Sequence, residues 1–180
     1  MKFTKARLPG LYVVELQPHL DPRGFFARTF CAREFEQHGL VTQFVQCSTS
    51  LSTKTGTIRG LHCQLPPASE TKLVRCTSGA VFDVVVDLRA DSPSYLDHFT
   101  IELSAKNRIA LYVPAGFAHG FQTLEDYSEV FYQISEFYQP EASAGLRHDD
   151  PRLGIRWPLA VSSISEKDLH WALLSNTGLP

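Results

Sequence analysis

Val81-Phe82-Asp83-Val84-Val85-Val86-Asp87-Leu88 is the stretch that decides the fold class. Its almost continuous run of β-branched and apolar residues is typical of a strand that is buried on both faces. Similar short segments recur on either side of it, between turn residues such as Gly56, Gly79 and Asn107. We predict strands at residues 11–16, 25–30, 42–51, 57–63, 71–78, 80–88, 98–103, 108–113, 120–123 and 129–137.

Helices have little room between these strands. The best helix candidate covers residues 32–38 and ends at Gly39, a residue type that commonly terminates helices. A second short helix is expected to begin within residues 165–168, in a turn-rich segment, 141–180, that wraps the strands. Many short strands without alternating helices indicate a sandwich or a barrel. We predict an all-β fold in a single domain of residues 1–180: a jelly-roll barrel with short peripheral helices, whose tapered interior accommodates a small ligand.

Amino-acid composition limits the classes of molecule that the protein is expected to bind. The 180 residues are 43% hydrophobic and 11% aromatic, which provides a sizeable core and excludes intrinsic disorder. The chain has 17 Lys and Arg and 19 Asp and Glu, so its net charge is −2. This charge argues against binding of nucleic acid, but it is compatible with binding of an anionic small molecule. No signal-peptide pattern and no apolar run of about 18 residues occurs, so we expect no membrane partner. Cysteines without a Cys-x-x-Cys pair are typical of a reduced, cytoplasmic protein.

Polar residues interrupt several predicted strands. Lys72 shares a strand face with Val74, and Tyr132 lies among apolar neighbours. Each residue alone has a plain structural explanation, such as a solvated lysine or a core tyrosine. In the strand at 57–63, regular alternation predicts two opposite faces. One face would carry Ile58, Gly60, His62 and Gln64, and the other Arg59, Leu61 and Cys63. A bulge at Gly60 would shift this pattern.

Taken together, these residues indicate proton transfer at a carbon beside a carbonyl group. His62 would remove the proton, because an imidazole titrates near neutral pH. Lys72 or Arg59 would stabilise the oxygen of the resulting enolate. Tyr132 would return a proton from the opposite side, and Asp168 would orient and polarise His62.

Two further carboxylates occur in the apolar strand. Asp83 and Asp87 either orient Lys72 or pair with Arg75 and Arg89. We favour the first role, because an unpaired carboxylate is costly to bury.

A second histidine, His119, follows the turn in Pro114-Ala115-Gly116-Phe117-Ala118-His119-Gly120-Phe121. With His62, it resembles the two half-motifs of cupin jelly rolls. Metal-binding cupins typically use three histidines and a glutamate. The His-x-His position here is His62-Cys63-Gln64, so we expect no bound metal and interpret His119 as part of an organic acid/base site. A metal-dependent cupin oxygenase or isomerase is the alternative.

Motifs at residues 21–26, 58–64, 72–75, 83–89, 114–121, 149–151 and 165–168, together with Tyr132, occur in order along residues 8–170. In this order they resemble the sugar-nucleotide epimerases of the dTDP-4-dehydrorhamnose 3,5-epimerase family. The resemblance implies a cofactor-independent, dimeric cupin enzyme. It would invert carbon 3, carbon 5 or both of a nucleotide-diphosphate 4-keto-6-deoxy sugar, by deprotonation and reprotonation from the opposite face.

The resemblance also implies a role for each matching residue. His62 matches the catalytic base, Asp168 its partner, Tyr132 the acid and Lys72 the enolate-stabilising lysine. The matching substrate-binding positions are Arg23, which the neighbouring subunit lends to the diphosphate, Phe26 and Tyr138, which pack on the nucleobase, the nucleotide contact Gln46, and Arg59 and His119.

Four ligand-side positions depart from the family pattern. Arg28 and Ser143 stand where glutamates are usual, Ser48 replaces an asparagine and His148 a tryptophan. A guanidinium only donates hydrogen bonds, whereas a carboxylate only accepts them. Arg28 would therefore bind a different edge of the nucleobase than the usual glutamate does. We therefore hypothesise CDP in place of dTDP, unless Arg28 points to solvent and stacking alone holds the base. A non-catalytic sugar-nucleotide binder is disfavoured, because binding alone needs no base paired with an opposite-face acid.

Overall fold

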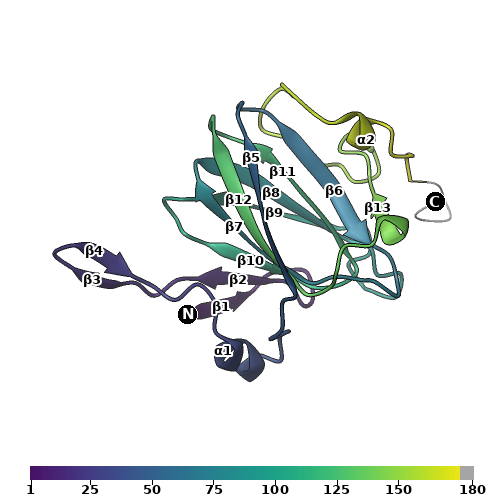
Figure 1. The fold of residues 1–180 in the computed structure, drawn as a ribbon. Coiled ribbons are helices and arrows are strands. Elements are labelled where there is room, and N and C mark those ends of the chain that lie inside the picture. Colours follow the sequence, from purple (N-terminus) through teal and green to yellow (C-terminus); the bar gives the residue numbers. More distant parts are fainter. Residues whose placement is uncertain (175–180) are drawn as a thin grey trace.

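Most of the strands form two antiparallel sheets that lie face to face in the computed structural model, which describes residues 1–174 (Figure 1). The six-stranded sheet has the order β1 (Lys2–Lys5), β2 (Tyr12–Glu15), β10 (Ala110–Val113), β7 (Lys72–Ser78), β12 (Ser128–Ile134) and β5 (Gln46–Ser52). The five-stranded sheet has the order β13 (Ser143–Gly145), β6 (Ile58–Gln64), β11 (Phe117–Thr123), β8 (Ala80–Asp87) and β9 (His98–Ser104). The all-β prediction is confirmed.

The main core lies between the sheets and follows from the alternation in β8 and β11. Val81 and Val85 of β8 pack with Phe117 and Phe121 of β11 and with apolar residues of the facing sheet. Each such fully buried side chain contributes about 1.5–3 kcal/mol to the free energy of unfolding. Val84 and its neighbours on the opposite face of β8 form a second core cluster. Strand β8 is therefore buried on both faces, as its composition predicts.

The C-terminal segment covers the outer face of the five-stranded sheet. Leu146, Leu153 and Leu174 belong to the cluster on that face. The buried Asp150 holds the segment in place, because its carboxylate accepts hydrogen bonds from the backbone N–H groups of Arg152 and Leu174. Residues 141–174 thus wrap the sheet as predicted, while residues 175–180 lie outside the described part of the chain.

The helices are short and peripheral. Helix α1 (Ala32–Gln37) ends just before Gly39, which has a φ of +68°, so the predicted helix and its glycine terminator are confirmed. Its one buried residue, Phe35, packs edge-on against Phe3 and Phe30. A 3₁₀ turn (Pro140–Ala142) and helix α2 (Glu166–Leu169) lie near the cavity described below.

Several strand boundaries differ from the predictions. The strand expected at 25–30 is only β4 (Gly24–Phe26), which pairs with β3 (His19–Asp21) in a hairpin. This hairpin, here called the arm, extends away from the sheets (Figure 1). Strand β5 begins four residues later than the predicted segment at 42–51. The short strands β1 and β13 have mostly exposed or half-buried residues, so no hydrophobic pattern predicts them.

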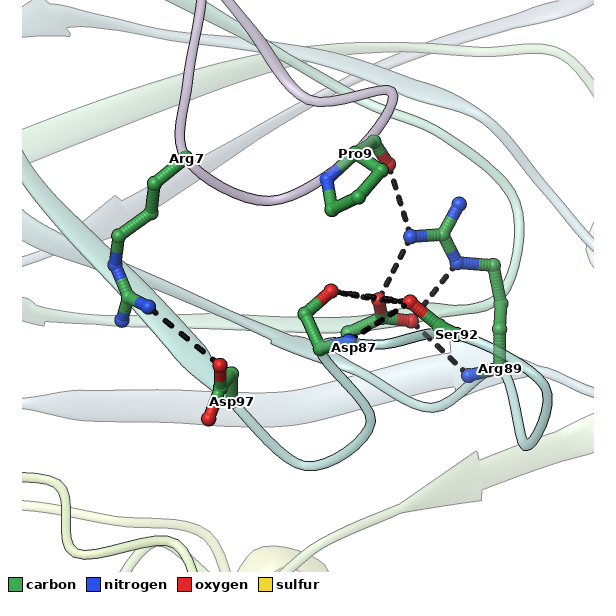
Figure 2. A network of polar contacts seen from close by, with 7 residues as sticks. Arg7, Pro9, Asp87, Arg89, Ser92 and Asp97 are labelled. Atoms are coloured by element: carbon green, nitrogen blue, oxygen red, sulfur yellow. Dashed lines mark hydrogen bonds and ion pairs between the residues drawn. The ribbon is translucent and has the colours of Figure 1, made fainter.

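A polar network closes the loop that follows β8 (Figure 2). Asp87 accepts hydrogen bonds from Arg89 Nε at 2.8 Å and Nη2 at 2.7 Å, and from the hydroxyl groups of Ser92 and Ser94. Arg89 also donates to the carbonyl oxygen of Pro9 at 2.9 Å, which ties the N-terminal loop to β8. The favoured role for Asp87, orienting Lys72, is therefore wrong, and the alternative pairing with Arg89 is confirmed.

Candidate active site

A cavity of about 630 Å³ lies between residues of both sheets and α2. Its wall combines polar and apolar groups, as small-molecule sites usually do. It contains most of the site residues that the sequence predicts: Ser48, Arg59, His62, Lys72, His119, Tyr132, Tyr138 and Asp168.

His62 and Asp168 form a close pair although 106 residues separate them. His62 Nε2 lies 2.5 Å from Asp168 Oδ1, and Asp168 Oδ2 accepts the Gly60 N–H at 3.3 Å. Ser165 caps α2 by accepting the Asp168 N–H, which fixes the helix turn that carries the carboxylate. Burial alone would raise the pKa of Asp168, but its hydrogen bonds and the His62 charge hold it below the ordinary value. Because an ionised carboxylate only accepts, Nε2 is the donor and Nδ1 is left to take up a proton.

Strand β6 carries a β-bulge that turns two site residues into the same cavity. His62 pairs with His119 of β11, but two residues along β11 Phe121 pairs with Arg59, so β6 has one residue more than its partner. Arg59 and His62 both line the cavity. Regular alternation, which would turn Arg59 away from His62, therefore does not hold, and the bulge expected as an alternative at Gly60 is confirmed.

Arg59 and Lys72 place two cations in the cavity wall. Arg59 Nε donates to Ser52 Oγ at 2.9 Å and Arg59 Nη2 donates to the carbonyl oxygen of Leu51 at 2.9 Å. Lys72 forms an ion pair with Glu70 at 2.8 Å, in which both side chains are largely buried. Both side chains line the same cavity as His62, and Lys72 Nζ lies 3.5 Å from the carbonyl oxygen of His62.

His119 forms a second imidazole–carboxylate pair in the same wall. Its Nε2 lies 2.8 Å from Asp83 Oδ2, and both side chains are buried. Burial raises the pKa of Asp83, and Asp83 Oδ1 is a buried oxygen that has no hydrogen-bond partner among residues 1–174. The hydrogen-bond partner of Asp83 is therefore His119, not Lys72 or Arg75, although the charge of Lys72 also acts to lower its pKa.

Tyr132 comes from the opposite sheet. It lies on β12, whereas His62 lies on β6, so the phenol and the imidazole line one cavity from two sheets. Burial raises the pKa of Tyr132, while a hydrogen bond with Ser50 and the charge of Arg59 act in the other direction. The phenol is therefore protonated at neutral pH and has a proton to give.

Other predicted residues lie elsewhere. Gln46 Oε1 accepts the Tyr138 N–H at 2.6 Å, beside the cavity. Arg23 and Phe26 lie on the arm, where Phe26 is 74% exposed. Phe26 and Arg28 line a separate recess of about 220 Å³. A single chain thus does not bring Arg23, Phe26 and Arg28 to the cavity that holds His62.

Residues at two positions that depart from the family pattern have partners in the structure. Arg28 forms an ion pair with Glu34 at 3.1 Å. Ser143 lines the cavity, and its hydroxyl accepts a hydrogen bond from Lys167 at 3.1 Å.

Sequence patterns do not identify several residues that contact the predicted set, among them Ser50 and Glu70. Both carry a local signal, since Ser50 lies two residues after Ser48 on one strand and Glu70 two residues before Lys72. Spacing by two places Ser48 and Ser50 on one face of β5, whereas Glu70 lies before the start of β7, and neither signal says which side chains form a pair.

Two negative findings apply to residues 1–174. They contain no cluster of three or more His, Cys, Asp or Glu side chains arranged to hold a metal ion. None of their helices is long and apolar enough to cross a membrane.

Comparison with known proteins identifies the family. A family model described as dTDP-4-dehydrorhamnose 3,5-epimerase matches residues 5–176. The chain belongs to this family. The dTDP-4-dehydrorhamnose 3,5-epimerase of Sinorhizobium fredii is 46% identical over 169 residues, which cover 93% of this chain and 87% of that protein.

Solved structures of the dTDP-4-dehydrorhamnose 3,5-epimerase family share the fold. The Bacillus anthracis protein, solved with TDP and PPi bound, is similar at a TM-score of 0.93 and 39% identity, covering 96% of this chain and 99% of that one. The Legionella pneumophila protein, solved in complex with dTDP-4-keto-L-rhamnose, has a TM-score of 0.87 and 36% identity, covering 93% of this chain and 89% of that one. The predicted cupin jelly roll is confirmed.

Proposed function

We propose that the protein is an isomerase that inverts carbon 3, carbon 5 or both of a dTDP-4-keto-6-deoxy sugar. The observation that carries this proposal is the single cavity in which the His62–Asp168 pair and the Tyr132 phenol come from different parts of the fold. The family match and the dTDP sugar bound to the Legionella pneumophila protein support this substrate. Because inversion through an enolate involves no net oxidation or reduction, the proposal includes no cofactor.

The proposed reaction begins with removal of a carbon-bound proton. The ketone at carbon 4 makes the hydrogens on carbons 3 and 5 acidic, and His62 Nδ1 takes one of them while Asp168 stabilises the imidazolium. The electron pair of the broken C–H bond moves to the ketone oxygen. Tyr132 then gives its hydroxyl proton to the same carbon from the other face, which inverts the centre.

Fixed positive charge in the cavity stabilises the enolate. Lys72 and Arg59 are held by neighbouring groups before the substrate arrives, so their charges need no reorganisation as the oxygen becomes negative. His119 is held in the same way by Asp83. The nucleotide supplies binding energy that keeps the sugar in the reacting position.

The test is solvent deuterium incorporation into a dTDP-4-keto-6-deoxy sugar, followed by NMR. We expect exchange and inversion at carbon 3, carbon 5 or both, and the exchanging positions identify which centres react. Replacing His62 with alanine should slow exchange by roughly 10²–10⁴-fold, because the base is lost, and leave nucleotide affinity within a few-fold. Absence of exchange at both carbons with the unsubstituted protein would refute the epimerase assignment.

We also propose a homodimer in which the arm of each chain completes the cavity of its partner. The arm lies apart from its own cavity and carries a cation, Arg23, together with exposed apolar residues, Leu20 at 80% and Phe26 at 74%. A guanidinium is a natural partner for a diphosphate. In the free chain Arg23 is paired with Asp21 at 2.6 Å, where its side chain is 90% exposed, and it would exchange that single carboxylate for the doubly charged diphosphate in the cavity of the other subunit.

Mixing two impaired variants tests this arrangement. His62→Ala chains lack the base and Arg23→Ala chains lack the diphosphate contact. After the subunits exchange, a mixed dimer has one cavity with both residues intact, so we expect the wild-type KM to reappear in the mixture. Light scattering should give the mass of two chains of 20.2 kDa. A monomer, or mixing that restores nothing, would contradict the proposal.

The nucleotide is proposed to be dTDP, with CDP as the second candidate. The position of Arg28 favours CDP, because Arg28 lies beside Phe26 on the surface expected to contact the nucleobase. The ion pair of Arg28 with Glu34 favours dTDP, since this carboxylate already occupies the guanidinium and competes with a contact to the nucleobase. Thermal-shift titrations with dTDP, CDP, GDP and UDP decide between them, and clear preference for dTDP would rule out the CDP hypothesis.

A further inference from the structure

The hydroxyl group of Tyr132 has a specific partner in the cavity. Ser50 Oγ lies 3.2 Å from Tyr132 Oη, and no other hydrogen bond to that phenol occurs within residues 1–174. The two residues lie on neighbouring strands, because Ser50 is opposite Val130 and Ser48 is opposite Tyr132 in the pairing of β5 with β12. Ser50 is thus diagonal to Tyr132, within reach of its hydroxyl group.

Strand β5 carries three alternating serines, of which Ser48 and Ser50 line the cavity. Ser48, Ser50 and Ser52 alternate along the strand and so share one face. Ser52 holds Arg59, whose charge acts on Tyr132, and Ser50 holds Tyr132 directly. A single edge strand therefore contacts both the phenol and a cation whose charge acts on it.

We propose that Ser50 is a positioning residue for Tyr132, which aims the phenol at the substrate carbon and donates a hydrogen bond to the phenolate formed when the proton leaves. This inference rests on the proposed epimerase function. It adds a residue to the reprotonation step alone, because the hydroxyl group of Ser50 bonds to Tyr132 and, within residues 1–174, to neither His62 nor Asp168.

The physical need for such a donor follows from the burial of Tyr132. Burial disfavours the phenolate, and the buried carboxylate of Asp83 disfavours it further. A hydrogen bond to an ionised group is stronger than one to a neutral group, so the Ser50 contact strengthens as the proton moves to carbon. Ser50 therefore stabilises the transition state of reprotonation more than the resting enzyme.

The ratio of inversion to deuterium exchange at the reacting carbon reports on the reprotonation step alone. In D₂O, His62 alone can remove a proton and return a deuteron to the same face, which gives exchange without inversion. Inversion requires Tyr132 as well. We expect Ser50→Ala to lower the ratio of inversion to exchange by roughly tenfold or more, the effect of losing one hydrogen bond to a charged group. The rate of exchange should change much less.

Matched variants separate this role from a general loss of stability. Ser50→Thr keeps the hydroxyl group and should keep most of the ratio. Ser128 is a buried serine on the same strand as Tyr132. The hydroxyl group of Ser128 lies within hydrogen-bond distance of the carbonyl oxygens of Ala80 and Glu125, and Ser128→Ala removes it. We expect Ser128→Ala to lower the melting temperature but to leave the ratio unchanged. If Ser50→Ala does not fold, Ser50→Cys gives the same comparison with a weak donor of similar size.

The outcomes distinguish the two proposals. Exchange with the unsubstituted protein, but an unchanged ratio in Ser50→Ala, would overturn the role of Ser50 and leave the epimerase function intact. A parallel fall of exchange and inversion would also overturn it, because a merely structural serine affects both steps. No exchange with the unsubstituted protein would remove the epimerase function and this inference with it.

Discussion

Two imidazole–carboxylate pairs lie side by side in the cavity wall, and their surroundings give them different roles. His62 and His119 are register partners on β6 and β11, and each binds its carboxylate through Nε2. His62 is 40% exposed and Asp168 keeps a lowered pKa, whereas His119 is 4% exposed and burial raises the pKa of Asp83. A firmly ionised carboxylate behind a more exposed imidazole favours His62 as the base.

Asp168→Asn tests this difference. The amide no longer stabilises the imidazolium and can hold the wrong tautomer, so we expect kcat for exchange to fall by roughly 10²–10⁴-fold with little change in KM. Asp83→Asn is the matched control and should lower kcat less. Steady-state kinetics of both variants provide the measurement, and an equal or larger effect of Asp83→Asn would assign the base to His119 instead.

At the level of the secondary-structure elements, the bulge in β6 determines the geometry of the site. It places Arg59 and His62 in one cavity although regular alternation would separate them. Gly60 makes the bulge possible, since its φ is +119° and a Cβ atom there would lie 2.6 Å from Gly120 Cα and 2.8 Å from the carbonyl oxygen of His119. Both contacts are with backbone, which cannot move away as a flexible side chain does.

Gly60→Ala is expected to destabilise the fold and to displace the base. Crowding and an unfavourable φ together should lower the free energy of unfolding by about 2–4 kcal/mol. Exchange activity should also fall, because Gly60 donates its N–H to Asp168. Urea unfolding measures the first effect and the deuterium assay the second. As a control for crowding alone, Gly24→Ala keeps the strain of a positive φ (+130°) but adds its Cβ atom where no atom beyond the chain neighbours lies within 4 Å, so it should cost less. Equal stability losses would contradict this account.

At the scale of the whole molecule, the Asp87 network joins regions that lie far apart in the sequence. Through Arg89 it links the end of β8 to the loop at Pro9 (Figure 2). Burial opposes the charge, but hydrogen bonds from Arg89, Ser92 and Ser94 lower the pKa of Asp87 from 3.8 to about 2. A carboxyl group with a lower pKa in the folded state stabilises the fold above its unfolded-state pKa and loses that contribution as pH falls.

The pH dependence of Asp87→Asn follows from this shift. We expect the variant to lose about 2–4 kcal/mol of unfolding free energy at pH 7, because Arg89 and two hydroxyl groups lose an ionised acceptor. The difference from wild type should be constant above about pH 4 and shrink as pH falls toward 2. Denaturant titrations at several pH values measure it. A difference that stays the same down to pH 2 would show that Asp87 is not held ionised by this network.

The amino-acid sequence by itself determines most of the long strands and much of the site. Period-two patterns and turn residues are local, so they predict β8, α1 with Gly39, and the shared face of Lys72 and Val74. The family motifs likewise lie within short segments and identify His62, Tyr132 and Asp168 as candidates without any coordinates.

Only the tertiary structure decides which of these residues meet. The pairing of His62 with Asp168 spans 106 positions, and that of Asp83 with His119 spans 36. The side to which Arg59 points depends on one extra residue in the register of β6 against β11. Such contacts arise from packing and from register between distant segments. No local periodicity encodes them, because the free energy that selects them comes from the whole assembled sheet.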